Sequence, residues 1–311
     1  MFSRTRGVGY DSAMSMAAEM TIHPTAIVSD ECVLGENVRI GPYCVIEGPV
    51  VLGPGCRLVS HVVIQGPVRI GAGVRLYPFA CIGFAAQDTK FAEGDETAGV
   101  EIGEESIIRE HVTVHAATKP DTPTRIGPHV FMMSGSHAGH DAQIGAHVTM
   151  MNNVAIGGHG EVGEGAVFGG GSTVHQSTRI GRLVMISGLA GTSMDVPPFC
   201  LVSDRNRMGG VNLVGMRRAG IPREQITAVR RAFSEVFRPC LPRPQMIEAL
   251  TERGLECPPV AEMAQFVRDG TDARGICPGM GKPPRDLMTW LQYRRRGKVS
   301  MGPLDTTNEQ D

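Results

Sequence analysis

The chain has 311 residues, a formal net charge of −2 and 41 % hydrophobic residues. These values are typical of ordinary soluble globular proteins of one or two domains, and they give no sign of a nucleic-acid partner. Two values depart from average usage, namely 40 glycines and only 5 % aromatic residues. This combination favours many short strands with tight corners over thick helical cores.

Residues 1–21 contain no recognisable targeting segment. Arg4 and Arg6 are not followed by an apolar run of about 7–15 residues, so neither a secretory signal nor a membrane span is supported. We expect a disordered leader and a cytoplasmic protein. The cysteines form no CxxC pair and no Cys/His metal spacing, and we interpret them as reduced structural thiols.

An aliphatic residue recurs at every sixth position, without a gap from Ile22 to Ile82 and again, after an interruption, from Ile102 towards Ile186. Small or β-branched residues such as Cys32 and Val38 follow four positions later. A period of six predicts a solenoid with three short strands per turn and coils about 4.8 Å apart. Amphipathic helices do not fit, because their periods are about 3.5 or 3.6 residues.

Two excursions interrupt the period within the predicted solenoid of residues 22–200. After residues 84–100 the aliphatic positions resume out of step with the earlier six-residue period. After residues 116–125 they resume in step with it. Excursions from a rigid coil commonly gather on one functional face.

The period ends after Pro197 and Pro198, and helical signals replace it. The expected helices are 222–238, 243–253 and 258–267. They place a small helical domain at residues 201–277. Residues 278–311 are expected to form a flexible extension that does not contact a membrane.

Several histidines fall in the central coils, and none of them occupies the aliphatic position of the six-residue period, which is expected to point inward. They are His115, His137, His140, His159 and His175. With a pKa of about 6.5, imidazole suits proton transfer near neutral pH. Imidazole also binds zinc, as in the trimeric β-helix carbonic anhydrases. The segment 126–176 offers no acidic relay of the kind expected around a zinc hydroxide, so we expect no metal.

An ordered set of short motifs identifies a family. The motifs are Gln87-Asp88-Thr89-Lys90, Thr113-Val114-His115, Ser136-His137-Ala138-Gly139-His140-Asp141, Asn152-Asn153, Gly157-Gly158-His159, Val174-His175-Gln176, Asp195-Val196-Pro197-Pro198, and Gly210-Val211-Asn212 followed by Arg217-Arg218. Over about residues 22–277, this set resembles the UDP-N-acetylglucosamine O-acyltransferases, which start lipid A synthesis.

The resemblance implies an all-β left-handed parallel β-helix, a hexapeptide-repeat solenoid, with a small C-terminal α-helical domain. It also implies a homotrimer that transfers a long, 3-hydroxylated acyl group from acyl carrier protein to the 3-position of UDP-N-acetylglucosamine. The sequence leaves open whether the acceptor group at that position is a hydroxyl or an amino group. No cofactor is expected beyond the acyl carrier protein that brings the acyl group.

By the same resemblance, His140 is the general base, Asp141 orients its imidazole, and the backbone N–H of Gly158 stabilises the oxyanion. The implied substrate-binding residues are Asp88, Lys90, His137, His159, His175, Gln176, Asn212 and Arg218. Gly188 matches the position that limits acyl-chain length, and glycine there leaves room for a long chain. Three residues depart from the family pattern. Val214 stands where many members carry Glu, Ala219 stands where many carry a second Arg, and Ala116 stands where an Arg can follow the histidine.

Several alternatives stay open at this point. His115 and His175 also fit as interface histidines. The sister family that N-acylates a UDP-3-O-acyl-glucosamine resembles the chain less, because its members carry a globular domain before the β-helix. A CoA-dependent acetyltransferase should lack the pattern around Asn212 and Arg218. A non-catalytic β-helix would make His140 dispensable.

Overall fold

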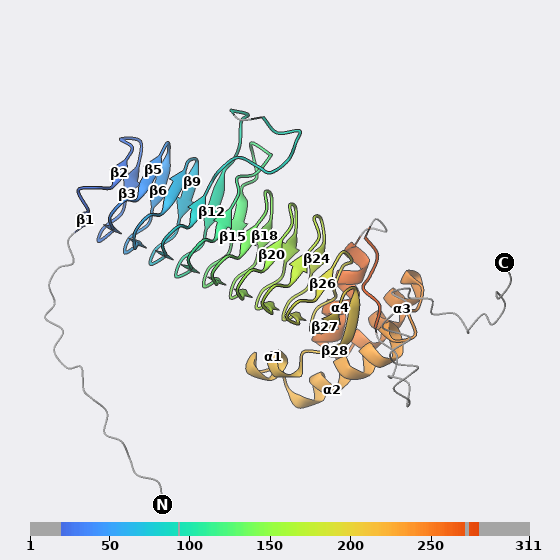
Figure 1. Cartoon of the computed structure of the whole chain (residues 1–311). Coiled ribbons are helices and arrows are strands. Elements are labelled where there is room, and N and C mark those ends of the chain that lie inside the picture. The colour runs from blue at the N-terminus through green and yellow to red at the C-terminus, as the bar shows by residue number, and fades with distance from the viewer. Residues whose placement is uncertain (1–19, 93, 271–273, 280–311) are drawn as a thin grey trace, which may run out of the picture.

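The computed structural model describes residues 20–92, 94–270 and 274–279, which form a three-sided parallel β-solenoid followed by helices (Figure 1). The chain visits three sheets in turn, named here sheets A, B and C. The edges where it passes between them are the A–B, B–C and C–A corners. Residues 1–19 of the predicted leader and most of the predicted extension lie outside the described residues. Thr21 was expected in the leader and instead belongs to the first strand, because it pairs with the next coil.

Each sheet is built from strands of two to five residues. Sheet A contains β1 (Thr21–Ile22), β4 (Arg39–Ile40), β7 (Arg57–Leu58), β10 (Arg75–Leu76), β13 (Ile107–Ile108), β16 (Phe131–Met132), β19 (Thr149–Met150), β22 (Val167–Phe168), β25 (Met185–Ile186), β27 (Cys200–Asp204) and β28 (Arg207–Val211). Sheet B contains β2 (Ile27–Val28), β5 (Val45–Glu47), β8 (Val63–Gln65), β11 (Cys81–Ile82), β14 (Thr113–Val114), β17 (His137–Ala138), β20 (Ala155–Ile156), β23 (Thr173–Val174) and β26 (Gly191–Thr192). Sheet C contains β3 (Val33–Leu34), β6 (Val50–Leu52), β9 (Val68–Ile70), β12 (Val100–Ile102), β15 (Thr124–Ile126), β18 (Gln143–Ile144), β21 (Glu161–Val162) and β24 (Arg179–Ile180).

The aliphatic positions fill the prism as the period predicts. Ile46, Ile64 and Ile82, stacked in sheet B, are each 0 % exposed. Ile22 differs, with 42 % of its surface exposed. It lies in the terminal described coil, where only one described coil packs against it. An aliphatic residue at the inward-facing position of the repeat is therefore not necessarily buried when it lies in the last coil of a solenoid.

Most corners contain a residue in the left-handed backbone region, directly before the small corner residue. Asn37, Asp141 and Asn153 have φ angles of 60°, 59° and 58°. Asn, Asp and His tolerate this conformation better than most residues with a Cβ. Several histidines also occupy it: His61, His111, His129, His147 and His159. The high histidine content therefore has partly a structural cause.

The helical unit follows the hairpin β27–β28 at the C-terminal end of the solenoid (Figure 1). It contains α1 (Leu213–Arg218), α2 (Arg223–Ala232), the π-helix η1 (Phe233–Phe237), α3 (Arg243–Gly254) and α4 (Pro258–Asp269). The three expected helices correspond to α2 with η1, to α3 and to α4. The sequence analysis missed α1 and the hairpin.

The segment that follows α4 returns to the fold. Pro278 accepts a hydrogen bond from the Met208 N–H at 2.9 Å, and the Gly279 N–H donates to Phe237 O at 3.1 Å. These two residues were expected in the flexible extension, and they instead pack on β28 and η1. None of the helices in the described ranges is long and apolar enough to span a bilayer.

Candidate active site

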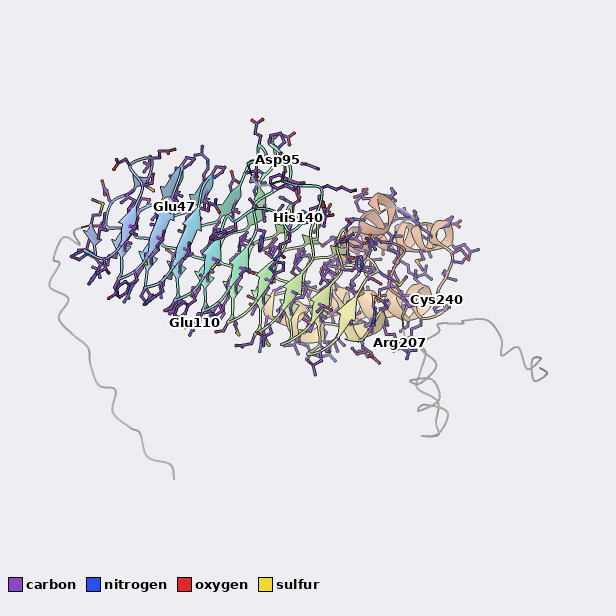
Figure 2. All side chains as sticks on the ribbon, turned by 45° about the horizontal axis from the view of Figure 1, so that its top comes forward. Glu47, Asp95, Glu110, His140, Arg207 and Cys240 are labelled. Carbon is purple, nitrogen blue, oxygen red and sulfur yellow. The ribbon has the colours of Figure 1, made fainter. Side chains whose placement is uncertain are left out.

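The candidate site lies at the B–C corner of the central coils. Sheet B ends at β17, Gly139 to Asp141 turn the corner, and β18 begins sheet C. Because His137 pairs with Ala155 in the next coil, residues 18 apart are stacked neighbours. This register places Gly158 and His159 beside His140 and Asp141. Figure 2 shows His140 on the side of the solenoid from which the excursion carrying Asp95 projects.

His140 and Asp141 form a hydrogen-bonded dyad. His140 Nδ1 lies 2.8 Å from Asp141 Oδ2, and the two side chains are 12 % and 6 % exposed. An ionised carboxylate only accepts, so Nδ1 carries the hydrogen and Nε2 keeps its lone pair. This is the tautomer that a general base acting through Nε2 requires.

Asp141 is held in place by the second excursion. The Thr118 N–H and hydroxyl donate to its carboxylate at 3.1 and 2.8 Å, and its own N–H donates to Thr124 Oγ1 at 2.7 Å. Burial alone would raise the pKa of Asp141, but the hydrogen bonds from His140 and Thr118 outweigh it and hold the pKa below its ordinary value of 3.8. The carboxylate therefore stays charged at neutral pH.

We expect Thr118→Val to lower kcat about 10-fold, because a hydrogen bond to a charged group contributes about 1.5 kcal/mol. Thr118 touches Asp141 rather than His140, so it is a positioning residue. Steady-state kinetics with a pH profile would measure the effect. Thr118→Ser keeps the hydroxyl and should restore kcat. Equal losses in both variants would contradict a role for the hydroxyl.

Gly158 lies directly against the imidazole of His140. A Cβ built on Gly158 would lie 2.5 Å from His140 Nε2 and 2.6 Å from Cε1. Such contacts are far shorter than van der Waals separation, so only glycine leaves the ring where it is. The position faces the edge of the imidazole that would accept a proton.

His159 and His175 continue the corner in the next two coils. His159 Nε2 lies 3.7 Å from Asp141 Oδ2, and its ring meets that of His140 edge-on, with centroids 5.0 Å apart. His175 Nδ1 lies 3.1 Å from the Gln176 carbonyl oxygen. The structure therefore aligns three of the predicted histidines along one edge. Among the described residues, one group of three has metal-binding potential: His140, Asp141 and His159. The expectation that residues 126–176 offer no acidic partner for the histidines was therefore wrong, because the corner turn places the Asp141 carboxylate against both rings.

His137 connects this edge to the first excursion. Its Nδ1 lies 2.8 Å from Thr113 Oγ1, and its ring centroid is 5.5 Å from that of His115. His115 Nδ1 in turn lies 2.8 Å from the Ala85 carbonyl oxygen. Burial lowers the pKa of His137 below its ordinary value of 6.5, and the nearby charges of His115 and His140 lower it further.

This pKa predicts a pH-dependent stability. Between the folded pKa of His137 and 6.5, the unfolded chain binds more protons than the folded one. The stabilisation is therefore complete above pH 6.5 and is lost as pH falls through the folded pKa. We expect a lower free energy of unfolding in urea at about pH 5.5 than at about pH 7.5, and a smaller difference in His137→Gln. His147→Asn, at an exposed corner, should keep the wild-type difference.

Both excursions leave the solenoid at the same B–C corner. The first connects β11 to β12, and the second connects β14 to β15, which begins at Thr124 and so shortens the expected 116–125 segment. The Ala98 N–H donates to Lys119 O at 2.8 Å, which joins the two excursions. Within the first, the Lys90 N–H donates to Asp88 Oδ1 at 2.9 Å. The structure therefore puts the excursions of Asp88 and Thr118 over the histidine edge.

Three predicted residues lie at other edges of the same chain. Asn212 caps α1 through the Gly215 N–H at 2.9 Å, and its Nδ2 donates to Leu183 O at 2.9 Å, at the C–A corner. Arg218 ends α1, and Gly188 lies at the A–B corner. A single chain thus does not bring these residues to His140.

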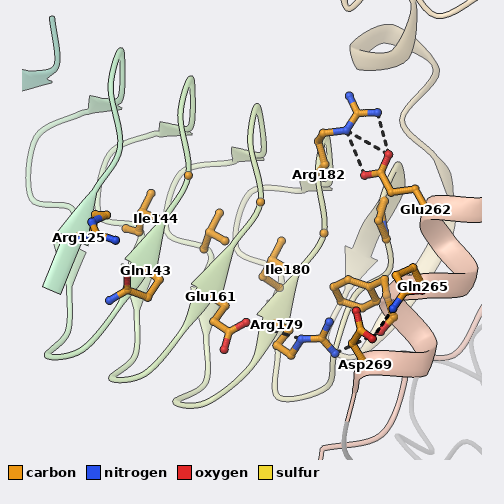
Figure 3. A pocket seen from close by; sticks show the side chains of 16 residues that line it. Arg125, Gln143, Ile144, Glu161, Arg179, Ile180, Arg182, Glu262, Gln265 and Asp269 are labelled. Atoms are coloured by element: carbon orange, nitrogen blue, oxygen red, sulfur yellow. Dashed lines mark hydrogen bonds and ion pairs between the residues drawn. The ribbon is translucent and has the colours of Figure 1, made fainter. Parts of the chain in front are cut away.

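Two other cavities lie outside the histidine edge. One of about 590 Å³ lies beneath the first excursion and includes Phe84, Phe91 and Asp95. Another, of about 660 Å³, lies between sheet C and α4 (Figure 3). Several of its charged groups are paired with one another, as in the Arg182–Glu262 contact of 2.9 Å. We assign neither cavity a ligand.

Comparison with known proteins agrees with this geometry. Residues 195–277 match the family described as "Udp N-acetylglucosamine O-acyltransferase; Domain 2", and residues 31–66 match the bacterial transferase hexapeptide repeat. The chain is 41 % identical over 268 residues to the acyl-(acyl-carrier-protein)–UDP-N-acetylglucosamine O-acyltransferase of Sinorhizobium medicae, covering 86 % of this chain and 98 % of that relative. With the enzyme of the same description from Sinorhizobium fredii, the identity is 38 % over 266 residues, covering 84 % and 96 %.

The crystal structure of UDP-N-acetylglucosamine O-acyltransferase from Moraxella catarrhalis is also similar. It superposes with a TM-score of 0.78 at 34 % identity, covering 82 % of this chain and 99 % of that one. The chain belongs to the UDP-N-acetylglucosamine O-acyltransferase family. As a member of this family it is an acyltransferase, and the predicted left-handed β-helix with C-terminal helices is confirmed. The roles of individual residues stay predictions.

The sequence analysis missed Thr118 and Thr124, which fix Asp141. Thr113 stood in one of the quoted motifs, but its contact with His137 was not foreseen. These contacts join residues 17 to 24 positions apart. They depend on how the coils stack around the second excursion, and the spacing of Thr118 and Thr124 gives no local signal for them.

Proposed function

We propose that this acyltransferase moves an acyl group from acyl carrier protein to the 3-hydroxyl of UDP-N-acetylglucosamine, the reaction that begins lipid A synthesis, with His140 as general base. The hydrogen-bonded series Thr118, Asp141 and His140 carries the proposal, because it leaves Nε2 able to accept a proton. A cytoplasmic location and independence from any further cofactor remain predictions.

The proposed chemistry balances within the two substrates. His140 Nε2 takes the proton of the sugar 3-hydroxyl as its oxygen attacks the thioester carbonyl carbon. A C–O bond forms, the C–S bond then breaks, and the leaving thiolate takes the proton back from His140. Asp141 stabilises the imidazolium between these steps, and the Gly158 N–H is proposed to stabilise the oxyanion, a contribution of about 3 kcal/mol.

The remaining predicted residues are proposed to hold the substrates. Asp88 and Lys90 in the first excursion would position the sugar. The residues proposed to line the nucleotide-sugar and acyl cleft are His137, His159, His175 and Gln176. Arg218 carries the fixed positive charge that would pair with diphosphate, and Asn212 lies six residues before it.

A homotrimer would complete this site. Outward positions of sheet B include Val45 and Val63, and those in the later coils of sheet A include Phe131 and Val167. The earlier coils of sheet A present Arg39, Arg57 and Arg75, and sheet C presents Glu101 and Arg125 beside the exposed Val33. Packing sheet B of one copy on sheet A of the next would bury the apolar faces. The B–C corner of one copy would then lie beside the C–A corner of its partner, so that Asn212 of the partner subunit approaches His140.

The test is acyl transfer by the purified full chain. UDP-N-acetylglucosamine would be supplied with 3-hydroxyacyl carrier proteins of several chain lengths, and parallel reactions would supply a UDP-sugar with a 3-amino group, or acetyl-CoA as donor. The proposal predicts transfer to the 3-hydroxyl from acyl carrier protein. Preference for the amino acceptor or for acetyl-CoA would replace it with one of the two rival acyltransferases.

Gly188 allows a test of chain-length selection. A Cβ at Gly188 would make only an ordinary contact, 3.4 Å from Gly170 O, so the first atom of a side chain does not force the backbone to move. We expect Gly188→Met to shift the preferred donor to shorter acyl chains with little change in Tm. Competition between donors of different length would measure the shift, with Gly188→Ala giving a smaller one. An unchanged preference would argue against this role.

A further inference from the structure

The cluster of His140, Asp141 and His159 has a second chemical capacity. We propose that it is a binding site for a divalent transition metal of the zinc class, and that the bound metal inhibits acyl transfer. Each of the three residues offers one ligand atom, and these atoms all lie within 4.8 Å of one another. Two imidazoles and one carboxylate with an open fourth position form a donor set that Zn²⁺ accepts in proteins.

The distances in the cluster suit a tetrahedral ion. Metal–ligand bonds of about 2.0–2.1 Å place neighbouring tetrahedral ligand atoms about 3.3 Å apart. Asp141 Oδ2 lies 2.8 Å from His140 Nδ1 and 3.7 Å from His159 Nε2, on either side of that value. Shifts of about half an ångström would bring both distances to that value, and the ligand atoms of His140 and His159 lie within 4.8 Å of each other.

The surroundings favour binding at this cluster. His159 is 40 % exposed, so the ion has a path from solvent. Thr118 already orients Asp141 from behind, as the outer hydrogen-bond partners of metal ligands do. The stacked pair His129 and His147 is a poorer site, because its rings are parallel within 4°, with centroids 4.9 Å apart, and do not converge on one point.

Inhibition follows from the atom that the metal would use. A metal on Nδ1 replaces the hydrogen of that nitrogen, so a neutral His140 would carry its hydrogen on Nε2. Nε2 then has no lone pair for the proton of the sugar hydroxyl. The metal would thus lower kcat more than it raises KM for the UDP-sugar. This consequence rests on the proposed role of His140, whereas binding of the metal does not.

The experiment separates binding from inhibition. Isothermal titration calorimetry with Zn²⁺, and visible spectra with Co²⁺, would be recorded on the full chain without substrates. The variants are Asp141→Asn and His159→Gln, with the double variant His129→Gln and His147→Gln as the matched control. Acyl transfer by wild type would be followed with rising Zn²⁺ and then with EDTA.

We expect one Zn²⁺ per chain in wild type and in the control, no saturable binding in Asp141→Asn or His159→Gln, and a tetrahedral Co²⁺ spectrum. Saturating Zn²⁺ should lower kcat at least about 100-fold, reversibly by EDTA, because the general base is lost. No saturable binding, or binding lost only in the control, would overturn the inference. Zn²⁺ bound at the cluster with undiminished transfer would also overturn it, and would count against His140 as base. A wild type inactive without Zn²⁺ that still binds one ion would instead refute the proposed function alone.

Discussion

Replacing His140 with alanine is expected to lower kcat for acyl transfer by about 10²–10⁴-fold, the usual contribution of a general base. The only change at the dyad is the loss of the imidazole, whose Nδ1 is held by Asp141 and whose Nε2 is available to substrate. His140 lies outside the aliphatic prism, so the variant should keep its core and its Tm. Steady-state kinetics with UDP-N-acetylglucosamine and a 3-hydroxyacyl carrier protein would measure the loss.

His147→Asn is the matched control for this variant. His147 is also a corner histidine, but it lies at the C–A corner and stacks on His129. Asparagine tolerates its φ of 58°, so the solenoid should be undisturbed. We expect kcat within about twofold of wild type. A His140→Ala variant that keeps wild-type kcat, or a control that loses as much, would remove His140 from the role of base.

The solenoid could be predicted from the sequence because every coil repeats one environment. An inward aliphatic residue such as Ile64 meets the same neighbours one coil above and one coil below, so the period of six survives local variation. The exceptions occur where that repetition stops. Ile22 has one described coil beside it, and hairpin β27–β28 turns antiparallel at the end of sheet A. Both depend on tertiary context that a periodic pattern does not contain.

The histidines show why composition alone could not locate the site. His129 and His147 satisfy the left-handed corner conformation and stack on each other, with no link to the dyad. His140 itself precedes such a corner residue, Asp141. The ordered motifs distinguished His140 from the rest, whereas the hydrogen bonds of Thr118 emerged only from the stacking of coils. Asn212 and His140 lie at different corners of one chain, and only the proposed trimer would bring them together.

Gly158→Ala should also cause a large loss of activity, about 10²-fold in kcat. The added methyl would lie 2.5 Å from His140 Nε2, so the imidazole has to move away from its position on Asp141. A displacement of the base by about 1 Å is enough for a loss of this size. The obstacle is a side chain and not the backbone of the next coil, so the solenoid should keep its Tm.

Gly170→Ala is the fitting comparison, because Gly170 is likewise a corner glycine that directly follows another glycine. Its added methyl would meet only Asn152 O, at 3.5 Å, an ordinary contact. We expect kcat close to wild type there, and both variants should melt at the wild-type temperature. An active Gly158→Ala would mean that His140 works from another position than the one seen here. A similar loss in Gly170→Ala would mean that corner glycines matter for the solenoid as a whole, and the close contact between Gly158 and the imidazole would then have no special part in catalysis.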